Sequence, residues 1–186
     1  MKKTLIELKE ATCRNTTYQL GLIELIHSLP SNIVDMVEIG SYQGESTVIF
    51  AEKIKNIKNI YAIDPWINGY ASGDVCSDLY PMEIVENNFD IRTKEFDSII
   101  KCKSTSKEKS FEFENESLDF VYIDGNHSYE STFEDINLWL PKIKKGGVIA
   151  GHDYLASCFM GVVNAVNDIF GSPDRIYQDT SWIKFL

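Results

Sequence analysis

Clustered basic side chains are scarce in this sequence. Its 186 residues hold 18 Lys and Arg against 28 Asp and Glu, a net charge of −10, and the lysines between 101 and 109 are interleaved with Ser, Thr and Glu. Neutralising a phosphate backbone needs grouped Lys and Arg, so nucleic acid is not an expected partner. The apolar runs are also too short to span a bilayer, so no membrane association is expected.

Closely spaced cysteine pairs are missing as well. The four cysteines stand at positions 13, 76, 102 and 158, and none forms a C-x-x-C pair. This spacing argues against a zinc ribbon or a thioredoxin-like motif and favours reduced thiols. Charged residues interrupt the first ten positions, so we expect no secretory signal peptide and a cytoplasmic protein.

Length and composition indicate a single α/β domain with an N-terminal extension. Of the 186 residues, 44% are hydrophobic and 25% are charged, which is ordinary for a globular protein with one core. We divide the chain into an N-terminal helical segment, 1–30, and a main domain, 31–186. The oligomeric state stays open, a homo-oligomer included.

The stretch 118–154 carries the strongest pattern. An apolar run at 118–123 and a second at 147–150 read as strands, and between them Tyr129, Phe133, Ile136 and Leu140 recur at helical spacing, which predicts one apolar helix face. A strand–helix–strand unit makes both strands parallel, with their carboxyl ends at the same edge of the sheet. Ligands of open α/β sheets bind at that edge. The polar residues that follow these two strands are Asp124, Asn126, His127, His152 and Asp153.

A glycine-rich corner precedes this unit. A strand at 33–39 runs into Gly40 and Gly44, and a helix begins near Ser46. A second strand, 59–64, ends on Asp64, 20 residues after Gly44, where a carboxylate can accept hydrogen bonds from ribose hydroxyls. The chain has neither the G-x-G-x-x-G of nicotinamide-binding sites nor the G-K-[ST] of a P-loop. The corner therefore predicts a nucleoside site of another kind.

The remaining chain supplies further helices and strands. Helices are expected at 16–29, 81–90 and 161–170, a third strand at 98–102 followed by a polar turn at 103–106, and two short strands within 175–186. Residues 65–81 show no period, so we expect a long binding loop that is mobile without acceptor.

Four motifs in this order resemble class I S-adenosylmethionine-dependent methyltransferases. They are VEIGSYQGEST, YAIDPW, IDGNHSYE and GGVIAGHDY, and the last two are similar to those of small-molecule (sugar and antibiotic) O-methyltransferases. The resemblance implies a single-domain Rossmann-like methyltransferase fold, with a seven-stranded, mostly parallel sheet whose last strand is antiparallel. The cofactor-site residues it implies are Gly40, Ser41 and Gly44 at the methionine moiety, Glu38 supporting that loop, Ser46 at the helix start, Asp64 on the ribose with Trp66 beside it, Ser104 near the adenine, and Asp124.

The same resemblance suggests how the acceptor is activated. It implies methyl transfer to a hydroxyl of a small molecule, a sugar or a glycosylated metabolite, with Asp124, His127, His152 and Asp153 as catalytic residues. Asp124, His152 and Asp153 would hold Mg²⁺ or Mn²⁺. Because His152 stands where several relatives have an acid and imidazole is a poor Mg²⁺ ligand, a metal-free histidine base is the competing mechanism. A non-catalytic binding module is the alternative function, and a nicotinamide-dependent oxidoreductase is disfavoured by the missing G-x-G-x-x-G.

Overall fold

The computed structural model describes residues 16–70 and 80–186, which form a seven-stranded sheet in the order β3-β2-β1-β4-β5-β7-β6. Pairs β3-β2, β2-β1, β1-β4 and β4-β5 are parallel, and β7 runs antiparallel to both β5 and β6. The fold class expected from the resemblance is confirmed. The strands are β1 (Asp35–Ile39), β2 (Asn59–Asp64), β3 (Ile99–Lys103), β4 (Leu118–Ile123), β5 (Ile143–Gly151), β6 (Arg175–Ile176) and β7 (Trp182–Phe185).

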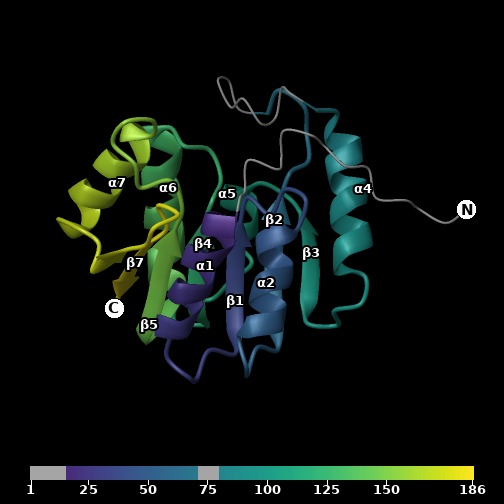
Figure 1. Cartoon of the computed structure of the whole chain (residues 1–186), viewed down its shortest axis with the longest axis horizontal. Helices are drawn as coiled ribbons and strands as arrows, with labels where there is room; N and C mark the ends of the chain where they lie inside the picture. The colour runs from purple at the N-terminus through teal and green to yellow at the C-terminus, as the bar shows by residue number, and fades with distance from the viewer. Residues whose placement is uncertain (1–15, 71–79) are drawn as a thin grey trace, which may run out of the picture.

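Helices cover both faces of the sheet (Figure 1). On one face, α1 and α2 pack over an apolar cluster that includes Leu22, Phe50 and Tyr122, with α4 beside them. On the other face, α6 and α7 cover a cluster that includes Trp139 and Val166. The helices are α1 (Thr16–Ser28), α2 (Glu45–Lys53), α4 (Met82–Thr93), α5 (Ser106–Ser110), α6 (Tyr129–Trp139) and α7 (Met160–Phe170), with a 3₁₀ turn, η2 (Leu140–Lys142), after α6.

Two expectations about local structure are wrong in detail. The turn expected at 103–106 instead contains the start of α5, which Thr105 caps through its hydroxyl while Glu108 reaches back to complete a capping box. The helix α6 exists, but its buried residues are Thr132, Asp135, Ile136 and Trp139. Phe133, expected on the buried face, is 37% exposed and stacks on Tyr129 at the surface.

The carboxyl ends of the parallel strands share one edge of the sheet, the upper edge in Figure 1. All loops that carry the expected site residues leave from this edge. Residues 1–15 and most of the loop expected at 65–81 lie outside the described residues, so the expected arm and the mobility of that loop stay predictions. The division of the chain at residue 30 also stays a prediction, although α1 contributes Leu22 and Leu25 to the core.

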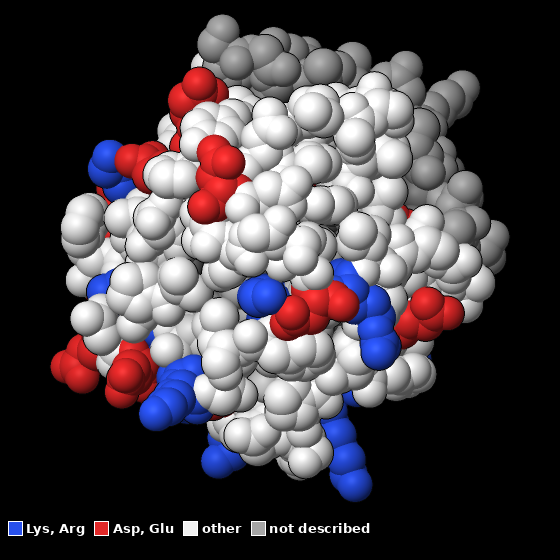
Figure 2. Space-filling model, turned by 90° about the vertical axis from the view of Figure 1, so that its left-hand side faces the viewer, with Lys and Arg blue, Asp and Glu red and all other residues white. Residues whose placement is uncertain are grey.

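Surface charge is mixed on the face that carries α7 and β7. Figure 2 shows Lys and Arg scattered among Asp and Glu there, with no continuous basic area. Within 16–70 and 80–186, no helix combines the length and the apolar character needed to cross a bilayer.

Candidate functional site

The glycine corner, residues 38–44, joins β1 to α2 and packs directly on the end of β4. Gly40 has φ +83°, and a Cβ atom at this position would lie 2.0 Å from the carbonyl oxygen of Asp124. Gly44 has φ +79°, and its Cβ would press on the ring of Phe89 at 3.0 Å. The expected place of Gly40 at the methionine moiety stays a prediction, and the nearest neighbour of its missing side chain is the backbone that follows β4. The glycine thus brings the end of the first strand and the end of β4 together.

Glu38 anchors the start of α2 from inside the protein. It is fully buried, and its carboxylate accepts hydrogen bonds from the hydroxyls of Ser46, at 2.5 Å, and Thr47. Burial raises the pKa of Glu38 to about 6, although these two hydroxyls lower it. The Ser46 hydroxyl, expected to face the cofactor, is therefore committed to Glu38.

The glycine corner also contains polar groups that a ligand could bind. The hydroxyl of Ser41 is buried and makes no well-formed hydrogen bond in the described part of the chain, although it lies close enough to Glu38 to lower the pKa of that carboxyl group. Helix α2 begins after Gly44 without a side-chain cap, so its first N–H groups point past the corner. A buried orphan hydroxyl and an uncapped helix start fit a polar ligand such as the amino-acid moiety of S-adenosylmethionine.

Asp64 connects the loops after β1 and β2. Its carboxylate accepts the backbone N–H of Tyr42 at 3.0 Å and that of Trp66 at 2.8 Å. Both donors lie in the left-handed region, with φ 44° and 46°, where non-glycine residues are strained. The N–H of Ser104 donates to the backbone carbonyl of Asp64 at 3.3 Å, so the expected ribose and adenine residues are neighbours.

Trp66 is a core residue in this structure. It is 4% exposed, its indole N–H donates to the carbonyl of Tyr42 at 2.8 Å, and its ring lies 5.0 Å from that of Phe89. Lys101 sits over the ring at 5.0 Å. Trp66 therefore stabilises the glycine corner through its contacts with Tyr42 and Phe89. Its expected contact with the nucleoside stays a prediction.

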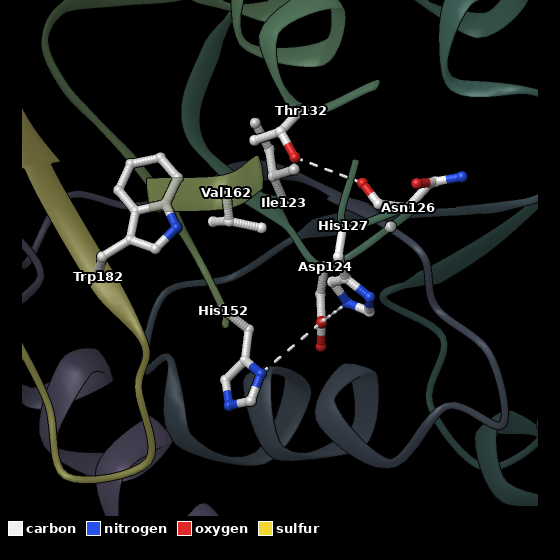
Figure 3. A pocket seen from close by; sticks show the side chains of 9 residues that line it. Ile123, Asp124, Asn126, His127, Thr132, His152, Val162 and Trp182 are labelled. Atoms are coloured by element: carbon white, nitrogen blue, oxygen red, sulfur yellow. Dashed lines mark hydrogen bonds and ion pairs between the residues drawn. The ribbon is translucent and has the colours of Figure 1, made fainter. Parts of the chain in front are cut away.

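Four titratable side chains meet at the ends of β4 and β5, and we call them the strand-end cluster: Asp124, His127, His152 and Asp153. His127 Nε2 lies 2.7 Å from Asp153 Oδ2, and His152 Nδ1 lies 3.1 Å from Asp153 Oδ1. Each histidine also approaches Asp124 Oδ1 at 3.9 Å, and Figure 3 shows Asp124 between them. The expectation from sequence that these residues converge agrees with this geometry.

The ion pairs of the cluster shift its titrations. Burial works to lower the pKa of His127, but its hydrogen bonds and charge interactions with Asp124 and Asp153 outweigh burial and raise the pKa to about 10. Burial likewise opposes protonation of His152, whose pKa is nevertheless raised by Asp153 and Asp124. Burial would raise the pKa of Asp153, but both imidazoles hold it well below its usual range. The shifts favour a cluster in which the imidazoles are protonated and Asp153 is ionised.

Three members of the cluster can also hold a metal ion. Asp124, His152 and Asp153 each offer one ligand atom, and these atoms lie within 4.8 Å of one another. Asp153 has φ 61°, a strained conformation for a non-glycine residue. Two oxygens and one imidazole nitrogen suit Mn²⁺ or another transition metal better than Mg²⁺.

A small pocket lies beside the cluster. In Figure 3, Trp182 and Val162 form one end of it, and Thr132 and Asn126 lie at the other. The indole N–H of Trp182 is buried and has no hydrogen-bond partner among the described residues. Phe159 packs against His127 with ring centroids 4.8 Å apart. Sequence patterns gave no signal for Trp182 and Phe159 here, because both approach the cluster from other parts of the chain.

The family of this chain follows from its similarity to known proteins. A profile for a methyltransferase domain matches residues 37–154, more than half of the chain. This chain belongs to the methyltransferase-domain family. The matched range runs from β1 to just past β5, so it contains the glycine corner, Asp64 and the strand-end cluster.

Individual relatives are distant. Uncharacterized proteins from Sinorhizobium fredii and Acanthamoeba polyphaga mimivirus are each 26% identical, over 69% and 72% of this chain. The chain spans only 14% and 57% of the lengths of these two curated relatives. A putative caffeoyl-CoA O-methyltransferase from Staphylococcus aureus shares the fold, with a TM-score of 0.60 and 14% identity, over 91% of this chain and 81% of that one.

Proposed function

We propose that this domain transfers the methyl group of S-adenosylmethionine to a hydroxyl of a small molecule, a sugar or a glycosylated metabolite. One observation carries the proposal: the strand-end cluster sits directly against the glycine corner. Gly40 approaches the backbone of Asp124 so closely that no Cβ fits between them. A cofactor in the corner and an acceptor at the cluster would therefore be adjacent, as an in-line displacement requires.

The corner would bind the cofactor through neutral and acidic groups. When bound, S-adenosylmethionine supplies an electrophilic methyl group on its sulfonium. Ser41 offers its buried hydroxyl and α2 offers its uncapped N–H groups to the methionine moiety. Each oxygen of Asp64 accepts one backbone N–H, and the same carboxylate would accept hydrogen bonds from the ribose hydroxyls.

The cluster would bind and activate the acceptor. Transfer forms a bond between the acceptor oxygen and the methyl carbon, breaks the bond from that carbon to sulfur, and releases the hydroxyl proton. A divalent ion held by Asp124, His152 and Asp153 would lower the pKa of that hydroxyl. Adjacent hydroxyls of a sugar would offer further oxygen donors, which supports this acceptor class.

A histidine base is the competing version of the same function. His127 or His152 would take the hydroxyl proton directly, while Asp153 holds the imidazole in place. This version needs the imidazole neutral, whereas the ion pairs with Asp153 favour the protonated form. The metal-assisted version needs His152 neutral as well, because a protonated imidazole cannot ligate a metal, so the ion pairs do not separate the two versions.

Removing divalent metal ions by chelation distinguishes the metal-assisted mechanism from the histidine-base mechanism. Purified protein would be stripped with EDTA and assayed for S-adenosylhomocysteine formation against a panel of sugars and glycosides, with and without added Mg²⁺ or Mn²⁺. Metal assistance predicts loss of turnover on chelation and recovery with Mn²⁺, while calorimetry still detects S-adenosylhomocysteine binding. Full turnover in EDTA would point to the histidine base.

A binding module without catalysis is the second candidate, because the cluster neutralises itself through the His127–Asp153 and His152–Asp153 pairs. In that case no methyl transfer would be detected, and Asp124→Asn and Asp153→Asn would leave the affinity for S-adenosylhomocysteine unchanged while altering stability. As matched control we choose Asp168→Asn, an exposed carboxylate on α7. Turnover that falls at least a hundredfold in the two cluster variants and not in the control would exclude the module.

A further inference from the structure

A buried hydrogen-bond donor in the small pocket beside the strand-end cluster has no part in the function proposed above. Trp182, on β7, is fully buried, and its indole N–H has no hydrogen-bond partner among the described residues. The indole of Trp66, by contrast, donates to the backbone carbonyl of Tyr42 at 2.8 Å. The indole of Trp139 donates to the hydroxyl of Ser106, also at 2.8 Å. Because a buried donor without an acceptor is costly, we expect Trp182 to bond a group from outside the chain.

The last residue of β5, Gly151, makes room for the nitrogen edge of this indole. Gly151 pairs with Trp182 across the sheet, and a Cβ atom on Gly151 would lie 2.8 Å from Trp182 Nε1 and 2.5 Å from the carbonyl oxygen of Ile123. A side chain at this position would therefore occupy the space beside the indole N–H. His152 follows directly in the chain, so the donor lies at the strand ends, next to the cluster.

The pocket beside the indole is polar and has the size of one water molecule. About 10 Å³ of it is open to the centre of a water molecule, and an ordered water needs about 10–15 Å³ measured in this way. In Figure 3 the nitrogen of the Trp182 ring is turned toward Val162 and the other lining residues. Cavities with apolar walls stay dry, whereas polar ones hold water that bonds buried polar groups.

Two further side chains that line the pocket supply acceptors for a water. The hydroxyl of Thr132, a buried residue, donates to the backbone carbonyl of Asn126 at 3.4 Å, and a hydroxyl that donates one hydrogen bond can also accept. Asp124 lines the same pocket, and a carboxylate accepts hydrogen bonds at both of its oxygens. One N–H donor and two oxygen acceptors match a water molecule, which accepts one bond and donates two.

We propose that this pocket binds one ordered water molecule, which accepts the indole N–H of Trp182 and donates to the Thr132 hydroxyl and the Asp124 carboxylate. The water joins β7, the first turn of α6 and the loop after β4. It also restrains Asp124, which the two histidines of the cluster approach only to 3.9 Å. The inference uses neither the cofactor nor the acceptor, so it is independent of the proposed function.

Nuclear magnetic resonance of the protein in metal-free buffer tests for this water. The three indole protons are observed in ¹⁵N-labelled protein, and Trp66→Phe and Trp139→Phe each remove one signal, which leaves the signal of Trp182. A long-lived water beside an indole proton gives a cross-peak at the water frequency with opposite signs in NOESY and ROESY spectra. Trp182 should show this cross-peak, and Trp66, which donates to a backbone carbonyl, should not. No cross-peak at Trp182 would overturn the inference.

Filling the pocket tests where the water lies. Val162→Ile adds one methyl group to the wall of the pocket, so it should abolish the Trp182 cross-peak and shift the indole proton upfield as its hydrogen bond is lost. Val166→Ile, one turn further along α7, changes a buried residue outside the lining and should keep the cross-peak. A cross-peak of full strength in Val162→Ile would place the water elsewhere and overturn the inference.

A third variant tests whether the signal comes from the Thr132 hydroxyl, because a hydroxyl proton that exchanges with solvent gives a similar cross-peak. Thr132→Val removes the hydroxyl with little change of shape. A bound water keeps its contacts with Trp182 and Asp124, so the cross-peak should persist at reduced intensity. Complete loss of the cross-peak with an unchanged backbone amide spectrum would assign the signal to the hydroxyl and contradict the water site.

Discussion

The glycine corner keeps its shape through backbone contacts and hydrogen bonds to the carboxylates of Glu38 and Asp64, whereas the strand-end cluster is held by ion pairs between partly buried side chains. In the corner, Glu38 accepts hydrogen bonds from hydroxyl groups and Asp64 accepts them from backbone amides. In the cluster, Asp153 is paired with two imidazoles. The first region has a fixed shape that suits one constant cofactor, and the second contains groups that can exchange protons or bind a metal ion.

The largest effect should come from filling the contact between the two regions. Gly40→Ala places a methyl group 2.0 Å from the Asp124 carbonyl oxygen at a positive φ, so the free energy of unfolding should fall by about 4 kcal/mol or more. Gly146→Ala is the matched control, because its φ is +79° but nothing lies within 4 Å of its Cβ. Denaturant unfolding of both variants measures the difference; equal losses would mean that the strand ends can separate.

Removing the Asp64 carboxylate should have the next largest effect. Asp64→Ala deprives Tyr42 and Trp66 of a charged acceptor, so stability should fall by about 2–4 kcal/mol and S-adenosylhomocysteine binding by about 1–3 kcal/mol. Urea unfolding and calorimetry measure the two losses, with Asp97→Ala, an exposed turn residue, as control. Unchanged stability would show that the two loops are held by other contacts.

The cluster should respond to pH in a higher range than the corner, because the pKa of Glu38 is about 6 and that of His127 is about 10. Because the pKa of His127 is about 10 in the folded protein and about 6.5 when unperturbed, the pair stabilises the protein fully below about pH 6.5 and loses this effect as the pH rises toward 10. In metal-free buffer, Asp153→Asn should lower the His127 pKa by more than one unit, measured from its imidazole NMR signals. Its stability should also fall less between pH 6.5 and 10. An unshifted pKa would contradict the ion pair.

The smallest effect concerns the orphan hydroxyl of the corner. Ser41→Ala removes a buried group without a hydrogen-bond partner in the described residues, so the unfolding free energy should change by no more than about 0.5 kcal/mol. Ser46→Ala, which takes a donor from Glu38, should cost about 1–3 kcal/mol in the same assay. If Ser41 contacts the cofactor, calorimetry should show about tenfold weaker nucleoside binding in Ser41→Ala, at the scale of one lost hydrogen bond. A large loss of stability in that variant would reveal an internal partner.

The parallel pairing of β4 with β5 and the convergence of the cluster were accessible from sequence because they follow from local patterns, whereas the seven-stranded sheet was implied by the family resemblance. Apolar runs that end on Asp124 and before His152, joined by a helical stretch, leave parallel pairing with both ends at one edge as the expected arrangement. The short helix α5 also had a signal, since Thr105 and Glu108 have the spacing of a capping box.

Features that depend on tertiary partners were not accessible. Hydrophobic periodicity placed Phe133 inside α6 and gave no reason to bury Asp135, because the donor that stabilises Asp135 comes from Ser106, 29 residues earlier. Asp64 holds two loops through the backbone N–H groups of Tyr42 and Trp66. Both residues have a positive φ, which neither residue type indicates in the sequence. Sequence patterns record burial and turns, whereas these contacts depend on loop geometry.

The shared acceptor at Asp64 also bears on how the site opens. The amide protons of Tyr42 and Trp66 are bound to one carboxylate, so neither loop can swing out without releasing the same anchor. Native-state hydrogen exchange should therefore find both amides in a single cooperative unit, with matching opening free energies. Entry of a nucleoside would then be governed by one concerted fluctuation of two loops that are 24 residues apart in the chain.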